Sequence, residues 1–256
     1  MSSEQVQRVR TPSKHLGVAA AEHVLLRRDA ITLLQYLRDH RVTGTQSTGN
    51  LPLQAIREIN TQLVPPMELD LRIGEKVFHL CSEEEVWCIH FPHILADVAG
   101  LLDGGRARRI RLTPAGERFL ASAAEYQVRV LFKIWWYRVN WMIAYPYVGL
   151  GTALPYRFSS RVLSHLKRLP VDERVPFEEF ADQVIETTGL TWTSTDPTYH
   201  RIALHGAVER MVIGILADFG VVKKHRRSKR IGKGTFKGLA AFRITSFGRA
   251  LLDSLD

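Results

Sequence analysis

Cysteine is scarce in this sequence, and the signature motifs of enzymes are missing from it. Cys81 and Cys88 are its 2 cysteines in 256 residues, too few for a disulfide framework. The chain has no glycine-rich phosphate loop that ends in Lys-Ser or Lys-Thr, no His-Glu-x-x-His pair and no nucleophile elbow. We therefore expect no enzyme and no bound cofactor, and nothing here indicates an oxidising compartment.

Long apolar runs are missing as well. No charged residue lies between Arg138 and Arg157, but Asn140, Pro146 and several glycines interrupt this stretch. A membrane-spanning helix needs ~20 apolar residues in a row. The first residues are polar, unlike a secretory signal. We expect a disordered N-terminus over residues 1–20 and a cytoplasmic protein.

Acidic residues are absent between Asp218 and Asp253, and this absence sets the charge of the chain. The formal net charge is +9, with 35 Lys and Arg against 26 Asp and Glu. Eight of these cations fall in one stretch, the basic segment: Lys223, Lys224, Arg226, Arg227, Lys229, Arg230, Lys233 and Lys237. A cation excess confined to one segment is typical of a surface that binds a polyanion. Glycines within it and apolar runs on both sides predict the mobile tip of a β-hairpin.

Apolar periodicity in the first half predicts three helices, a strand and a further helix. The expected elements are helices over 22–40, 53–64, 87–102 and 114–124 and a strand over 106–113. Pro65-Pro66 and Asp103-Gly104-Gly105 end the second and third helices, and Pro114 suits a first helical position. Residues 66 to about 85 are expected to be irregular. This order is that of a winged-helix domain.

The second half repeats this order. We expect helices over 159–169, 176–187 and 196–219, then a hairpin that contains the basic segment as an enlarged wing. Ser159 or Ser160 is the expected cap of the first helix, Gly189 follows the second, and Asp196-Pro197 begins the third. An aliphatic-Thr pair, a glycine and an apolar helix start recur at 112–120 and 244–252, which supports two copies of one plan.

We therefore predict an α+β fold, mainly α with small β-hairpins. It comprises two winged-helix domains, over 21–125 and 158–256, joined by an aromatic-rich helix and loop over 126–157.

The joining segment is the most aromatic part of the chain. Its apolar residues follow helical spacing from Val128 to Met142, which predicts a buried helix between the two domains. The alternative is a surface for a protein partner or a second copy of the chain, formed by Trp135, Trp136 and Trp141.

Three segments of the first half occur in the order TGTQSTGNLPLQAIREI, RIRLTPAGERFL and LFKIWWYRVNW. They resemble a region of uncharacterised bacterial proteins of the Ri-plasmid open-reading-frame family. The resemblance covers roughly residues 22–147, and the β-rich domain that names the family has no counterpart here. It implies a bacterial protein and no particular activity, because the family has no settled function. The second half looks like a generic winged-helix domain, a helix-turn-helix class used in transcription regulation and also in contacts between proteins.

Two groups of residues in the second half are candidate DNA contacts. The basic segment would bind phosphates, with Phe236 near its tip to stack on a base. Arg201 and His205, together with His200 and Arg210, lie off the apolar face of the third helix, where major-groove contacts are made. The alternatives are a solvated loop and an ordinary polar helix face.

The first half adds an acid-free cluster of four arginines, Arg106, Arg108, Arg109 and Arg111. Strand alternation places Arg109 and Arg111 on one face and Arg106 and Arg108 on the other. This cluster is either a second phosphate contact or simple surface arginine.

One set of residues has the chemistry of a zinc site: His79, Cys81, Cys88 and His90, with His93 nearby. Their spacing matches no known zinc finger. Buried thiols and surface histidines are the alternative, and we predict no metal.

These observations favour a regulatory or architectural protein that binds double-stranded DNA through its basic wing. The alternatives are a protein-interaction or dimerisation module of a larger bacterial complex, and RNA as the polyanion.

Overall fold

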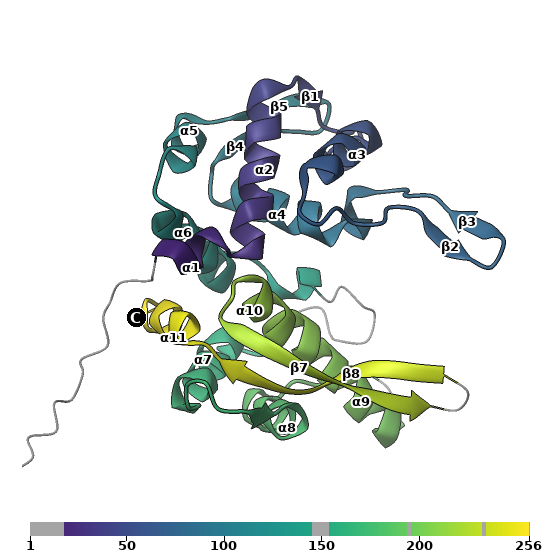
Figure 1. Cartoon of the computed structure of the whole chain (residues 1–256), viewed down its shortest axis with the longest axis vertical. Coiled ribbons are helices and arrows are strands. Elements are labelled where there is room, and N and C mark those ends of the chain that lie inside the picture. Colours follow the sequence, from purple (N-terminus) through teal and green to yellow (C-terminus); the bar gives the residue numbers. More distant parts are fainter. Residues whose placement is uncertain (1–17, 145–153, 194–195, 232–233, 256) are drawn as a thin grey trace, which may run out of the picture.

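The computed structural model describes residues 18–144, 154–193, 196–231 and 234–255. Helices dominate, and the strands form small antiparallel sheets, so the predicted α+β class is confirmed. The two halves of the chain lie one above the other in Figure 1, with the first half at the top. None of the described helices combines the length and apolar character that a membrane span requires. The predicted disorder of residues 1–20 falls almost wholly outside the described residues.

The first half packs three main helices against a small sheet. Its elements are α1 (Val18–Glu22), α2 (Leu25–Asp39), β1 (Val42–Thr43), α3 (Leu53–Gln62), β2 (Leu71–Ile73), β3 (Lys76–Phe78), η1 (Glu83–Glu85), α4 (Trp87–Val98), β4 (Leu102–Gly105), β5 (Arg108–Leu112) and α5 (Pro114–Leu120). The sheet order is β1-β5-β4, with Val42 opposite Ile110. Both residues are buried, so the sheet closes the core formed by the helices.

The second half shares part of this order: a helix, a short strand, two further helices, a hairpin and a last helix, without counterparts of α1, η1 and the β2–β3 hairpin. Its elements are α7 (Phe158–Arg168), β6 (Val175–Pro176), α8 (Phe177–Thr188), α9 (Pro197–Val208), the π-helix η3 (Glu209–Gly214), α10 (Ile215–Asp218), β7 (Val222–Ile231), β8 (Gly234–Ile244) and α11 (Ser246–Asp253). The sheet order β6-β8-β7 repeats that of the first half, because the short strand again pairs with the last strand of the hairpin.

In the first half, a threonine holds the turn between the last strand of the sheet, β5, and helix α5. Thr113 Oγ1 donates to the Gly100 carbonyl (2.8 Å) and accepts from the Gly116 N–H (3.1 Å), which caps α5. A Cβ added to Gly116 would lie 2.3 Å from the Leu101 carbonyl oxygen. Only glycine fits at this point.

The second half repeats the same contacts. Thr245 Oγ1 donates to the Gly220 carbonyl (2.9 Å) and accepts from the Gly248 N–H (2.8 Å), which caps α11. A Cβ on Gly248 would lie 2.1 Å from the Val221 carbonyl oxygen. The similarity between 112–120 and 244–252 therefore reflects one hydrogen-bonded motif used twice.

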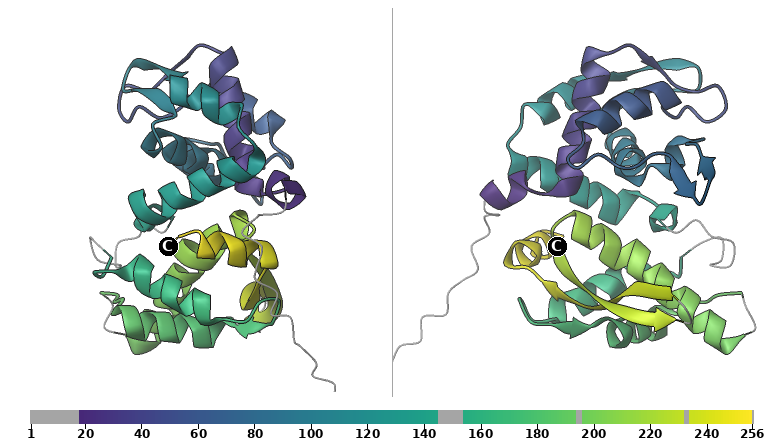
Figure 2. Two further views of the ribbon diagram at one scale, coloured as in Figure 1. Left: turned by 90° about the vertical axis from the view of Figure 1, so that its left-hand side faces the viewer. Right: turned by 45° about the vertical axis from the view of Figure 1, so that its right-hand side comes forward.

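The aromatic segment joins the halves by a helix, as its periodicity predicts, but the helix ends at Arg138 and does not reach Met142. Trp141 and Met142 lie in the short 3-10 helix η2 (Trp141–Ala144). Figure 2 (left) shows α6 (Ala124–Arg138) running between the halves. Trp135 stacks on Trp141 (ring centroids 4.6 Å apart) and on Phe219 of the second half (5.6 Å). Trp135, Trp136 and Trp141 are all buried within the chain. The alternative, in which these rings form a partner surface, does not fit, because a partner would have no access to them.

Several local predictions were wrong. The cap of α7 is neither Ser159 nor Ser160, since Phe158 is the first helical residue and Arg157 precedes it in a left-handed conformation. The span 66–85 contains the β2–β3 hairpin rather than only irregular chain. The basic segment is not a mobile loop over most of its length, because its residues lie on the paired strands β7 and β8.

Candidate nucleic-acid interface

The basic segment belongs to the longest hairpin among the described residues. Strand β7 pairs with β8 from Val222 opposite Ile244 to Ile231 opposite Gly234. Val222 and Ile244 are buried, so the base of the hairpin is anchored in the core. In Figure 1 the far end of the hairpin projects beyond the helices of the second half, and in the right-hand view of Figure 2 it lies alongside α9.

The cations of the wing are presented to solvent where their side chains are described. The exposed ones are Lys223, Lys224, Arg226, Arg227 and Lys237. Lys229 and Arg230 follow on β7, Phe236 lies on β8, and Lys233 lies outside the described residues. The geometry of a stacking contact by Phe236 therefore also lies outside what is described.

One wing cation is tied back to the body. Arg226 donates to a carboxylate oxygen of Glu209 (3.0 Å) and to the Lys237 carbonyl (3.0 Å). Glu209 begins the π-helix that continues α9. The base of the wing is thus held against the same helix that carries the candidate groove contacts.

Two of the candidate major-groove residues on α9, Arg201 and His205, contact the same carboxylate, that of Asp182. Arg201 donates to Asp182 of α8 (2.8 Å), and the His205 ring nitrogen lies 2.7 Å from the other carboxylate oxygen. The hydrogen bond from Arg201 and then that from His205 hold the pKa of Asp182 below its usual value. The paired Arg201 is exposed, but the His205 side chain is only 14% exposed. His200 is half-buried, and Arg210 is exposed.

In the arginine cluster of the first half, two cations likewise pair with one carboxylate. Arg111 (2.9 Å) and Arg108 (3.1 Å) both donate to Asp103 of β4, and the hydrogen bond from Arg111 is the main cause of the lowered pKa of this carboxyl. The predicted separation of Arg108 from Arg111 on opposite faces is wrong. The register of β4 and β5 shifts between Asp103 and Gly105, which disrupts strict alternation. Arg106 and Arg109 are exposed.

An acid thus accompanies each group of candidate DNA contacts: Asp103, Asp182 and Glu209. None of these acids is adjacent in sequence to the cations it pairs with, so the local charge pattern does not reveal them. In the sequence, Glu209 was the one sign of such an acid, because it lies among the polar residues of the helix predicted over 196–219.

Neutralising Glu209 tests whether such an acid weakens binding. Glu209→Gln is expected to tighten the binding of duplex DNA about threefold at low salt, because it frees Arg226 and removes a negative charge beside the phosphates. Fluorescence anisotropy with a labelled duplex measures this. Glu186→Gln, an equal charge change on the exposed face of α8, is the control and should have a smaller effect. A loss of affinity in Glu209→Gln would mean that Glu209 positions Arg226 for binding.

A cavity of about 610 Å³ lies at the base of the wing, between the two halves. Asp218 of α10 lines it beside Lys224 of β7 and Trp87 of α4. Burial raises the pKa of Asp218, and Lys224 partly offsets this. Asp218 also acts on Asp29 of α2: burial and then the charge of Asp218 raise the pKa of Asp29 to about 7.

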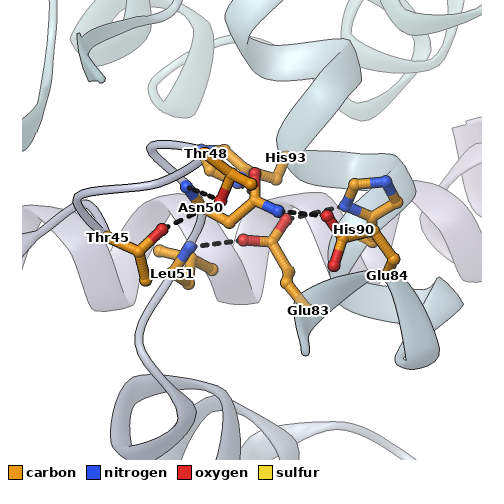
Figure 3. A network of polar contacts seen from close by, with 8 residues as sticks. All are labelled: Thr45, Thr48, Asn50, Leu51, Glu83, Glu84, His90 and His93. Carbon is orange, nitrogen blue, oxygen red and sulfur yellow. Dashed lines mark hydrogen bonds and ion pairs between the residues drawn. The ribbon is translucent and has the colours of Figure 1, made fainter. Parts of the chain in front are cut away.

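A buried carboxylate organises the loop that precedes α3 in the first half. Glu83 accepts hydrogen bonds from His90 Nδ1 (2.9 Å), His93 Nδ1 (2.9 Å) and the Leu51 N–H (2.5 Å), as Figure 3 shows for this network. Despite its burial, the pKa of Glu83 is lowered to about 2 because these donors favour the ionised form. The neighbouring Asn50 donates to Glu84 (2.5 Å).

These contacts also account for the residues of the zinc hypothesis. His90 turns to Glu83, His79 pairs with Asp70 (3.4 Å), and Cys81 is exposed. Cys88 is half-buried, and burial raises the pKa of its thiol to about 11. Within the described part of the chain, no group of three or more such side chains is arranged to hold a metal ion.

Comparisons with known proteins returned no match: no family model, no curated protein and no solved structure is similar to this chain. The resemblance of residues 22–147 to the Ri-plasmid open-reading-frame family therefore stays a prediction.

Proposed function

We propose that the protein is a cytoplasmic double-stranded-DNA-binding protein with a regulatory or architectural role, built from two winged-helix domains. In each half, three helices with a short strand after the first are closed by a hairpin. In each, the short strand pairs with the outgoing strand of the hairpin. This arrangement supports the domain class, because a winged-helix unit is a three-helix bundle closed by such a sheet.

The observation that carries the proposal is the charge of the β7–β8 hairpin. It projects from the body, presents exposed cations, and lies in a stretch of chain without Asp or Glu. Phosphate contacts supply most non-specific DNA affinity. The hairpin would run along the phosphate backbone, while α9, the third helix of its domain, faces the major groove.

Removing four of these cations tests the proposal. The variant Arg226→Ala, Arg227→Ala, Lys229→Ala, Arg230→Ala is expected to bind duplex DNA about 100-fold more weakly at moderate salt, similarly across sequences. Its log–log salt slope should be shallower by up to about 3.6, since each of four phosphate contacts contributes about 0.9. Anisotropy titrations of duplex, single-stranded DNA and RNA at two salt concentrations measure this and identify the preferred nucleic acid.

A charge-matched control separates the wing from net charge. Arg72, Lys76, Arg118 and Lys133 are exposed and lie outside the wing, and their replacement by Ala removes the same charge. This control should lose far less affinity than the wing variant. Equal losses in both variants, or unchanged affinity in the wing variant, would reject the proposal.

One observation favours a second function, that of a protein-interaction module. The β2–β3 hairpin projects from the first half in Figure 1, and its Leu71, Ile73 and Phe78 side chains are each more than half exposed. Leu71 pairs with Phe78 across the hairpin, so the two lie on one face. Size-exclusion chromatography with light scattering, with and without DNA, distinguishes the functions: a protein that self-associates and never shifts DNA belongs to this second class.

A further inference from the structure

The exposed face of α9 is apolar at the place where a recognition helix meets base edges. Ile202 is 65% exposed and Tyr199 is 55% exposed. They lie three residues apart and so on the same face of the helix. Among the isoleucines whose side chains are described, only Ile73 and Ile202 are exposed, whereas Ile213 in the π-helix that continues α9 is buried. An isoleucine on a helix surface forgoes the stabilisation that burial would provide.

The charged residues beside Tyr199 and Ile202 are already engaged. Asp182 holds both Arg201 and His205. The side chain of Asp196 accepts from the N–H groups of Thr198 and Tyr199, which fixes the start of the helix. The first two turns of α9 therefore offer apolar groups to a ligand more readily than free cations.

The phosphate-binding surface borders this same helix. Arg226 of the wing contacts Glu209, which directly follows α9. A duplex lying along the wing would bring its grooves to α9, whose N-terminal residues are the ones that reach base edges in helix-turn-helix proteins. The nearby charge thus points to DNA as the occupant of this apolar face.

Only one apolar group projects into the major groove of B-DNA, the C5-methyl of thymine. We propose that Ile202 and Tyr199 contact thymine methyl groups, so that the protein prefers duplexes with thymine at the positions facing α9. This inference rests on the proposed DNA-binding function and adds to it a base preference. It also implies a preference for DNA over RNA, because uracil lacks the methyl group.

Deoxyuridine substitution tests the proposal directly. The full-length protein is titrated with a short alternating A·T duplex and with the same duplex in which deoxyuridine replaces thymidine. The two probes differ only in the C5-methyl groups. We expect the thymine duplex to bind about fivefold more tightly, in keeping with the transfer free energy of a buried methyl or methylene group.

Variants link the preference to the helix. Ile202→Ala should lower the affinity for the thymine duplex about threefold and leave that for the deoxyuridine duplex unchanged, because only the first has a methyl group to lose. Val64→Ala removes a similarly exposed aliphatic side chain, 60% exposed just after α3, and should change neither affinity. Since both side chains are exposed, circular dichroism of the two variants should match that of the parent protein.

The outcomes are distinct. Equal binding of both duplexes overturns this inference and leaves the DNA-binding function standing. A thymine preference that persists in Ile202→Ala and in Tyr199→Ala also overturns it, because the methyl contact then lies elsewhere. Binding to neither duplex overturns the proposed function itself, and this inference with it.

Discussion

Replacing Glu83 with alanine is expected to lower the free energy of unfolding by about 3 kcal/mol at neutral pH. The Glu83 side chain is fully buried and accepts from two histidines and from the Leu51 N–H. Its removal leaves these donors without their acceptor and leaves a cavity between α4 and the loop before α3. Urea unfolding followed by tryptophan fluorescence measures the change.

The pH dependence of the Glu83 contribution has a definite sign. The folded-state pKa is about 2, below the ordinary value of 4.5, so the folded state favours the ionised form. The stabilisation is present above pH 4.5 and is lost as the pH falls toward 2. Glu83→Ala should therefore differ from the parent protein most near neutral pH and least in strong acid.

Glu85 provides the control for this experiment. It lies in the same short helix η1 and is exposed, so Glu85→Gln should change the stability by less than about 0.5 kcal/mol. If Glu83→Ala unfolds at the same urea concentration as Glu85→Gln, the network does not stabilise the fold.

Much of the helical structure was predictable because it depends on local chemistry. Asp196 accepts from two N–H groups of α9, as its place before Pro197 indicates. Gly189 and Gly220 both adopt positive φ just after a helix, at +73° and +72°. Each of these boundaries is determined by residues within one turn of it, so a single sequence suffices to locate them.

The short strands could not be found in this way. Strands β1 and β6 have two residues each, which is too short for any alternation to appear. They exist because each lies beside a hairpin strand that is far away in the sequence, as with Val175 opposite Phe242. The sequence therefore predicts the order of the helices and the hairpin in each half. It does not predict that a short strand after the first main helix joins the hairpin in one sheet.

The candidate site was predictable in its charge but not in its pairing. The lack of Asp and Glu from 219 to 252 correctly marks the wing as one basic hairpin. The sequence gives no sign that Glu209 lies 3.0 Å from Arg226, or that Asp182 lies between Arg201 and His205. Such pairs depend on how α8, α9 and β7 pack together. The number of cations counted in the sequence is therefore larger than the number that are not paired with an acid in the fold.

The substitution Asp29→Asn is expected to raise the free energy of unfolding by about 3 kcal/mol at pH 8 and to change it little at pH 4.5. Asp29 is buried on α2, with Asp218, Arg28 and Cys88 as the titratable and charged groups near it. Burial and the charge of Asp218 raise its pKa from 3.8 to about 7, outweighing the opposite effect of Arg28. The folded state therefore binds more protons than the unfolded state between these values, and the parent protein loses stability as the pH rises through them.

The asparagine side chain of the Asp29→Asn variant is neutral at every pH and similar in size, so the variant escapes this loss. Urea unfolding from pH 4.5 to pH 8.5 should show the two proteins diverging up to about pH 7 and then running parallel. Asp39→Asn, an exposed change at the end of the same helix, should not produce this divergence, because its pKa is lowered by Arg38 rather than raised. A constant difference at all pH values would show that Asp29 is already ionised in the folded protein. The charge of Asp218 acts on Asp29, and the charge of Lys224 at the base of the wing acts on Asp218. If duplex DNA bound to the wing changes the charge around Lys224, the pKa of Asp29 should shift. The same urea titration in the presence of duplex DNA measures this shift.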